Sequence, residues 1–357
     1  MKQMVALFLC LAMLLLLPAC HAPDSETPGT TPPRESVTAT TGENASESGI
    51  ASVTESAAGT EPGTEAGSVT ESATESVTET VTETESATES ATETGSGPVY
   101  SEGLEFEWVE EIGAYAVFDS GTCRDEEIRI PPTYQGGPVE QILDYAFYGS
   151  DAKRIILPDT VSAIGVEAFM NCRQLEEICL PSALVQIGER AFSGCTSLCR
   201  VVFEDGKLEA ISERAFEGCT ALSEVVFPER LTLIGKWAFV GCVALTDLRF
   251  PDSLLTIDEG AFSDCTGLVT LELPQALQVL GSDSFMRCTS LERVMLPKSV
   301  RNMGWSIFGS CRNLQTIRYA GTVSEWRSIF KCGKWHEGAG RVEIACSDGT
   351  IYDEYHP

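Results

Sequence analysis

Histidine is scarce in this chain, since only three of its 357 residues are histidines. His21 lies near the N-terminus, and His336 and His356 lie near the C-terminus. The long stretch between them therefore cannot hold a Cys–His or Ser–His–Asp catalytic arrangement. The chain also lacks an HExxH zinc motif and a phosphate-binding glycine loop. We expect no enzyme, no cofactor and no small-molecule substrate, and we interpret Trp335-His336-Glu337, the best catalytic candidate, as a loop near the C-terminus.

Basic residues are also few, because 24 Lys and Arg stand against 53 Asp and Glu, a formal net charge of −29. Nucleic-acid binding needs a basic stripe, so we expect no nucleic-acid partner. Beyond residue 17 no apolar run is long enough to span a bilayer. Any attachment to a membrane must then come from the first residues.

The N-terminus begins with Lys2 and continues with an apolar run over residues 5–17, a pattern typical of a secretion signal. It ends in Leu17-Pro18-Ala19-Cys20, which resembles the bacterial lipobox and implies that Cys20 is diacylated and becomes the mature N-terminus. The alternative is an ordinary signal peptide cleaved after a small residue. We predict a lipoprotein signal peptide over residues 1–20, with lipid as the only membrane contact.

Residues 21–98 consist mainly of Ser, Thr, Glu and Gly, with almost no large apolar side chain. Such a segment cannot bury enough apolar surface to offset the entropy lost on folding. Its carboxylates repel one another and extend the chain, which as an ideal coil would span about 50 Å. We predict a disordered tether that holds the remaining residues away from the membrane.

The second half of the chain repeats the phrase Ala-Phe-x-x-Cys about every 23 residues, a period typical of leucine-rich solenoids. The phenylalanines are Phe147, Phe169, Phe192, Phe216, Phe239, Phe262, Phe285 and Phe308. A cysteine follows each by three positions, except that Ser150 stands in the first unit; these are Cys172, Cys195, Cys219, Cys242, Cys265, Cys288 and Cys311. We expect both sets to form structural ladders inside a stack of coils.

One unit, residues 175–192, shows how a coil is built. Its Leu175, Ile178 and Leu180 predict a short strand that Pro181 ends, since proline cannot donate to a strand ladder. A second extended piece should end at Ile187-Gly188, followed by one turn of helix over residues 189–195. The predicted fold is an α/β repeat, a leucine-rich repeat solenoid with short parallel strands plus one helical turn per repeat.

This pattern resembles the BspA-like leucine-rich repeat family of bacterial surface proteins. The resemblance rests on the Leu-Pro at strand ends, the Ile-Gly turn and Ala-Phe-x-x-Cys-x-x-Leu. The resemblance extends to the two ends of the repeat array, where the units differ from the others. These end units lie around Tyr115-Ala116-Val117 and around Tyr319-Ala320-Gly321-Thr322. The domain boundaries we predict are a leucine-rich repeat domain over 99–357, with an N-terminal cap at 99–140, repeats at 141–318 and a C-terminal cap at 319–357.

Fourteen cysteines in an exported chain could indicate a disulfide framework. The seven in register instead occupy positions where a small apolar group fits, so we interpret them as buried thiols, with some disulfides or a metal as alternatives. A column does not bring four ligands to one point, so we expect no metal. Cys332 with Cys346 is a possible disulfide in the last cap.

Strand alternation predicts which residues face outward. The candidate binding face is the outward column Ile156, Cys179, Val202, Val226, Arg249, Glu272, Met295 and Arg318. Its first half is apolar and its second half mostly charged, and an exposed apolar patch is typical of a contact site. The alternative is that β-branched residues simply favour strands. The second face, on the predicted helical turns, carries Arg190, Lys236 and Trp237 and is a weaker candidate.

The resemblance implies an adhesin: a lipid-anchored binding protein on the extracellular face of the bacterial membrane that engages host matrix proteins or other bacteria. Its expected partner is a protein ligand. The alternative is an envelope-associated scaffold or a polysaccharide-binding module with no host ligand. A polysaccharide site should show an aromatic row on an exposed face, and the outward columns contain none.

Overall fold

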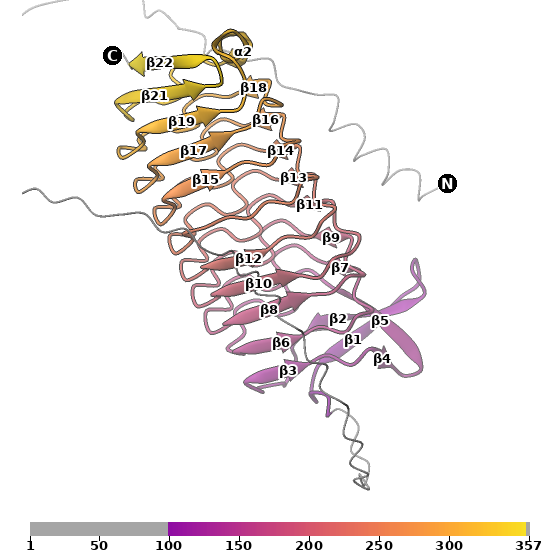
Figure 1. Ribbon diagram of the computed structural model, residues 1–357. Coiled ribbons are helices and arrows are strands. Elements are labelled where there is room, and N and C mark those ends of the chain that lie inside the picture. The colour runs from indigo at the N-terminus through magenta and orange to yellow at the C-terminus, as the bar shows by residue number, and fades with distance from the viewer. Residues whose placement is uncertain (1–98, 355–357) are drawn as a thin grey trace, which may run out of the picture. The chain divides into compact units, whose positions relative to one another are not determined.

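The computed structural model describes residues 99–354, in which successive coils stack into a solenoid (Figure 1). The predicted signal peptide, the lipidated Cys20 and the tether lie outside the described residues. Within them the coils repeat about every 23 residues, which confirms the predicted leucine-rich repeat solenoid. Nearly all of its regular structure is strand.

Each coil gives one strand to a short-strand ladder and, except for the coil around Arg249, one to a long-strand ladder, and successive strands in each ladder are parallel. The long-strand ladder contains β3(Glu127–Arg129), β6(Arg154–Ile156), β8(Glu177–Leu180), β10(Arg200–Phe203), β12(Glu224–Val226), β15(Thr270–Glu272), β17(Arg293–Leu296), β19(Thr316–Tyr319) and β21(Arg341–Cys346). The short-strand ladder contains β5(Gly137–Ile142), β7(Ala163–Ile164), β9(Gln186–Ile187), β11(Ala210–Ile211), β13(Leu233–Ile234), β14(Thr256–Ile257), β16(Val279–Leu280), β18(Asn302–Met303) and β20(Phe330–Lys331). Parallel pairing places equivalent residues of successive coils in columns.

Each ladder is divided into two sheets, at different heights in the stack. The long-strand ladder is interrupted between β12 and β15, and the short-strand ladder between β9 and β11. The second interruption lies in the coil where Glu204-Asp205-Gly206 replaces the usual proline and adds a residue. Because the interruptions do not coincide, each coil stays joined to its neighbour along at least one side.

The core is a stack of phenylalanine rings. The eight rings from Phe147 to Phe308 are buried, and neighbouring centroids lie between 4.9 and 5.9 Å apart with nearly parallel planes. This spacing matches the separation of adjacent strands, so each coil places its ring directly over the last. Burying one such ring contributes about 1.5–3 kcal/mol, before the cavity that its removal would leave is counted.

The predicted helical turn in each repeat is wrong. In the coil of Phe192, both Arg190 and Gly194 have left-handed φ angles, 54° and 74°, and the same four-residue spacing recurs along the stack. An α-helix cannot pass through such residues, because it needs right-handed φ at every position. The Phe192 amide instead donates to the carbonyl of Ala215 in the next coil, at 2.8 Å. Ala191 and Phe192 are nevertheless buried.

The glycines after the short strands allow close approach between coils. A Cβ on Gly188 would lie 2.3 Å from the carbonyl carbon of Gly165, and one on Gly235 would lie 2.6 Å from the Ile211 oxygen. Neither glycine has a positive φ. Their role is therefore to leave room for the neighbouring backbone, rather than to permit a tight bend.

The seven cysteines in register are buried, and each thiol donates to the phenylalanine carbonyl of the preceding coil. The Sγ–O distances run from 3.0 Å at Cys172 to 3.3 Å at Cys242 and Cys288. Burial raises the pKa of Cys219 and Cys242, so these thiols stay protonated at neutral pH. A cysteine here supplies an apolar body together with a weak donor.

Both ends of the stack carry additional elements. At the N-terminal end β1(Glu105–Val109) and β2(Ala114–Asp119) form an antiparallel hairpin, and β4(Thr133–Tyr134) pairs antiparallel with β5. At the C-terminal end α2(Val323–Ser328) begins with a capping box between Thr322 and Glu325, and β22(Gly349–Glu354) pairs with β21.

The predicted C-terminal cap contains one further coil. The amide of Phe308 donates to the Trp335 carbonyl at 2.9 Å, and the two rings meet edge to face at 6.2 Å. The Trp335 ring therefore covers the last phenylalanine, although Trp335 takes the backbone position of the alanine that precedes each phenylalanine and His336 takes that of the phenylalanine.

Candidate binding face

The long-strand ladder presents one outward side chain between two inward ones on each strand. In β8 and β17 the residues alternate between buried and exposed, so Cys179 and Met295 face out while Ile178 and Val294 face in. Ile156, Val226 and Met295 are exposed by 38%, 42% and 43%. The outward column is accessible at all eight of its predicted positions.

Strand register brings these positions side by side. Val202 is paired with Cys179 on one side and with Val226 on the other, and Met295 is paired with Glu272 and Arg318. Arg249 belongs to no strand, because it lies at the interruption between β12 and β15. The predicted column is therefore divided into an apolar half on β6, β8, β10 and β12 and a mainly charged half on β15, β17 and β19.

A row of alternating charge runs beside the apolar half. It consists of Glu127, Arg154, Glu177, Arg200 and Glu224 on successive strands. Arg154 lies 3.8 Å from Glu127, and Arg200 pairs with both Glu177 and Glu224, the latter at 3.1 Å. Each of these arginines thus has a carboxylate within 4 Å in the chain, and the apolar side chains beside the row are a further feature that a partner could use.

A hollow of about 230 Å³ opens in the apolar half, lined by Ile156, Cys179 and Glu204 among others. Glu204 lies in the lengthened coil, and its carboxylate accepts from the Ser182 amide at 3.1 Å and from the Cys179 thiol at 3.7 Å. Burial and the nearby Glu204 carboxylate raise the pKa of Cys179, so its thiol is a poor nucleophile at neutral pH. The hollow is suited to binding rather than to covalent chemistry.

The charged half has a second hollow, of about 250 Å³, that includes Glu272, Arg293, Met295 and Arg318 in its lining. Within residues 99–354 neither Arg293 nor Arg318 forms an ion pair shorter than 4 Å with an acidic side chain. Arg249 is 3.5 Å from Asp247. This half therefore offers cationic groups that a partner could neutralise, in contrast to the apolar half.

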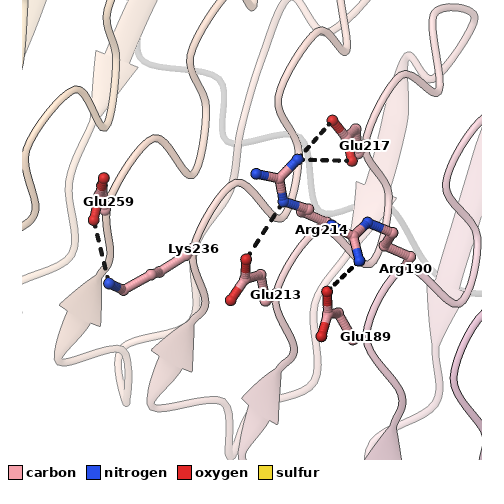
Figure 2. A network of polar contacts seen from close by, with 7 residues as sticks. All are labelled: Glu189, Arg190, Glu213, Arg214, Glu217, Lys236 and Glu259. Atoms are coloured by element: carbon pink, nitrogen blue, oxygen red, sulfur yellow. Dashed lines mark hydrogen bonds and ion pairs between the residues drawn. The ribbon is translucent and has the colours of Figure 1, made fainter.

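The turns that follow the short strands form the second, weaker candidate face. Figure 2 shows their charges paired with one another, in a network of Glu189, Arg190, Glu213, Arg214, Glu217, Lys236 and Glu259. Lys236 lies 3.2 Å from Glu259, and this hydrogen bond raises the lysine pKa. A partner would have to break these pairs to use the charges, which makes the face less suited to binding.

The remaining predicted residues lie in the last cap. Cys332 is buried and Cys346 half-buried, and no disulfide joins them in the part of the chain that the structure describes, so their pairing stays a prediction. His336 is buried against Trp335, with ring centroids 4.0 Å apart. Burial lowers its pKa, although the nearby Asp353 carboxylate opposes this shift.

From 99 to 354 no helix is both long and apolar enough to cross a bilayer. In the same residues no three His, Cys, Asp or Glu side chains are placed to hold a metal ion.

Comparison with known proteins relates the chain to leucine-rich repeat proteins. The family model of the BspA type leucine rich repeat region matches six copies, over residues 140–268 and 209–332. No curated protein matches the chain.

Solved structures with a similar fold come from several bacteria. A leucine-rich repeat protein of T. pallidum is 23% identical, with 70% of this chain and 100% of that chain covered and a TM-score of 0.38. A leucine-rich cell surface protein of Faecalibacterium prausnitzii is 21% identical, with 67% and 99% covered and a TM-score of 0.29. A leucine-rich repeat protein of Bacteroides ovatus is 21% identical, with 68% and 98% covered and a TM-score of 0.25.

Proposed function

The chain belongs to the BspA-type leucine-rich repeat family, and from this premise we propose that it is a binding protein displayed on a bacterial cell surface. Its partner is a protein, and the contact is made by the long-strand ladder. The observation that carries the proposal is the exposed apolar half of that ladder, where Ile156, Cys179, Val202 and Val226 stand in one column. A solenoid suits this role because its stacked strands present a continuous surface.

The finer role is that of an adhesin that engages host matrix proteins or other bacteria. The apolar column supports it, since apolar side chains that are exposed together form a surface that a protein partner can cover. The charge row beside it, in which Arg200 pairs with Glu177 and Glu224, supports a contact whose affinity depends on apolar burial. The alternative role is a scaffold in the envelope, which would need no preferred ligand.

The test is capture of matrix proteins and of bacterial surface extract by the full chain and by Val202→Glu/Val226→Glu. We expect saturable binding of a protein that the double variant loses, because two carboxylates would be buried at the contact. The matched control is Val185→Glu/Val243→Glu, which adds the same charge at exposed valines away from this column.

The other outcomes of this capture experiment distinguish the strand-face site from a site elsewhere and from the scaffold role. Equal loss in both double variants would show a general effect of charge and remove the strand face as the site. Binding that survives Val202→Glu/Val226→Glu would move the site elsewhere. A folded chain that retains no protein would favour the scaffold.

We also propose that Cys20 carries the lipid that holds the protein at the membrane. The support is the apolar run before it and the resemblance of Leu17-Pro18-Ala19-Cys20 to a lipobox. Cys20→Ala should release the protein from the membrane fraction of expressing bacteria, and it should abolish incorporation of labelled fatty acid. Retention of label in the variant would contradict the assignment.

A further inference from the structure

The N-terminal end of the stack exposes a strand edge. The sheet order there is β1-β2-β5-β7-β9, and within residues 99–354 β1 pairs with β2 alone. The hairpin of β1 and β2 lies at the N-terminal end of the ribbon, next to β4 and β5 (Figure 1). A terminal strand presents a row of backbone N–H and C=O groups to which a further strand can be added.

The opposite end of the stack is differently arranged. There α2 packs against β22, the outermost strand. The Val323 amide donates to the Asp348 carboxylate at 2.7 Å, and the Ser347 amide donates to the Gly321 carbonyl at 2.9 Å. These bonds tie the β21–β22 turn to the start of the helix. The described residues include no such helix beside β1.

The side chains of β1 alternate in character along the exposed edge. Glu105 and Glu107 are exposed, whereas Phe106 and Trp108 join a chain of aromatic contacts. Phe106 stacks on Tyr134 at 4.2 Å, Tyr134 meets Tyr115 at 5.1 Å, and Tyr115 meets Trp108 at 5.1 Å. Trp108 remains 44% exposed. The edge therefore offers carboxylates on one side of the strand and aromatic rings on the other.

The segment that carries this edge has charge of one sign. Residues 99–119 contain no Lys or Arg, and their acidic residues are Glu102, Glu105, Glu107, Glu110, Glu111 and Asp119. Like charges on an edge strand repel a second copy of the same strand, which discourages self-association through β1. The same charges attract a strand of opposite sign. Charge thus selects the kind of partner that the open edge can accept.

We propose that β1 is a docking edge for an extended, lysine- or arginine-rich segment of a partner protein, which adds to the sheet as a further strand. Main-chain hydrogen bonds to β1 would supply part of the affinity. Basic side chains at alternate positions would face Glu105 and Glu107, and the other positions would pack on Phe106 and Trp108.

This edge is separate from the proposed strand-face site, because β1 belongs to the sheet that contains β5, β7 and β9 rather than to the long-strand ladder. A variant with a substituted edge therefore leaves the apolar column intact, and the two proposals can fail independently.

The experiment measures binding of a short peptide of alternating lysine and threonine to the full chain by calorimetry. Glu105→Lys/Glu107→Lys should weaken binding by roughly tenfold, because two pairs of opposite charge are lost and replaced by repulsion. The matched control is Glu229→Lys/Asp252→Lys, which changes net charge equally at exposed carboxylates elsewhere and should bind as the unmodified chain does. Hydrogen exchange should slow in residues 105–109 and stay unchanged in residues 349–354 of β22.

A second peptide separates strand addition from simple charge attraction. The same sequence with N-methyl groups at alternate backbone nitrogens keeps its lysines but cannot pair with a strand, so we expect its binding to be lost. Equal binding of both peptides, or equal weakening by the control variant, would overturn the proposal. So would self-association of the full chain that Glu105→Lys/Glu107→Lys abolishes, because a second copy would then occupy the edge.

Discussion

The inward and outward columns of the same coils differ in how much they vary along the chain. Inside, phenylalanine recurs in eight successive coils and cysteine in seven, and every one of these side chains is buried. Outside, the column on the long strands changes from Ile156 and Val202 to Glu272 and Arg318. The interior is constrained by the spacing of about 5 Å between coils, which a similar ring in each of these coils fills. Nothing in the stacking constrains the exterior, so that surface can adapt to a partner.

The two halves of the outward face differ in charge pairing as well. Arg200 in the apolar half lies between Glu177 and Glu224, whereas Arg293 and Arg318 in the charged half form no such close pair within residues 99–354. A protein that used the apolar half would bind largely through apolar burial. One that used the charged half would be sensitive to salt.

The largest effect in a comparison of interior and exterior is expected for Phe239→Ala, in the middle of the stack. It should destabilise the repeat domain by about 3–5 kcal/mol, because the ring lies between Phe216 and Phe262 and its loss leaves a cavity. Urea unfolding followed by circular dichroism measures the change. Val226→Ala, on the exposed column, is the control and should cost far less. A similar loss of stability in Phe239→Ala and Val226→Ala would show that the interior and exterior columns do not differ in their contribution to stability.

A backbone test is Gly188→Ala, where the added methyl group would lie 2.3 Å from the carbonyl carbon of Gly165. We expect a loss of about 1–3 kcal/mol, since neighbouring coils must move apart. Gly333→Ala is the control, because a Cβ there would meet its nearest atom, on Trp305, only at 3.9 Å. The unfolding temperature of Gly188→Ala should lie clearly below that of Gly333→Ala. An unchanged unfolding temperature in Gly188→Ala would show that neighbouring coils can move apart at little cost.

The buried His336 extends the comparison of interior and exterior to the pH dependence of stability. His336 is 4% exposed, and burial lowers its pKa below the ordinary value of about 6.5. The unfolded chain thus takes up the proton first, so this contribution to stability is complete above pH of about 6.5 and is lost as the pH falls toward the folded-state pKa. In His336→Phe the unfolding midpoint should depend less on pH in this window. An unchanged pH dependence would assign it to other groups.

The smallest effect is expected at the exterior. Arg200→Ala removes the contacts with Glu177 and Glu224, yet all three side chains are substantially solvent-exposed, so the unfolding midpoint should barely move. Raising the salt concentration should reduce even that difference. A large loss would show that the charge row holds the strands together, and the contrast between interior and exterior would then be weaker than proposed.

Much of the fold follows from the period of about 23 residues. The strand over Glu177–Leu180 and the extended pair ending at Ile187 lie where the sequence predicts them. The prediction failed at residues 189–195, where Ala-Phe-x-x-Cys suggested a helix. Local propensity cannot reveal that Arg190 adopts a left-handed φ, because that conformation is held by hydrogen bonds to the next coil.

The candidate face was only partly predictable. Alternation along each strand correctly identifies which residues face outward, but it does not show that the ladder is interrupted around Arg249. The edge of β1 was missed altogether. Its signal in the sequence is the alternation Glu105-Phe106-Glu107-Trp108, which only the pairing of the whole sheet places at an open edge.

By itself the sequence determined the coil: its length, the residues that point inward, and the excess of negative charge. The first two follow directly from the repeated local pattern, and the charge follows from composition. Tertiary structure alone decided the left-handed turns, the staggered interruptions of the two ladders, the pairing of Arg200 and the exposed edge of β1. Each of these depends on how one coil lies against the next, and contacts between residues far apart in the chain leave no local pattern to read.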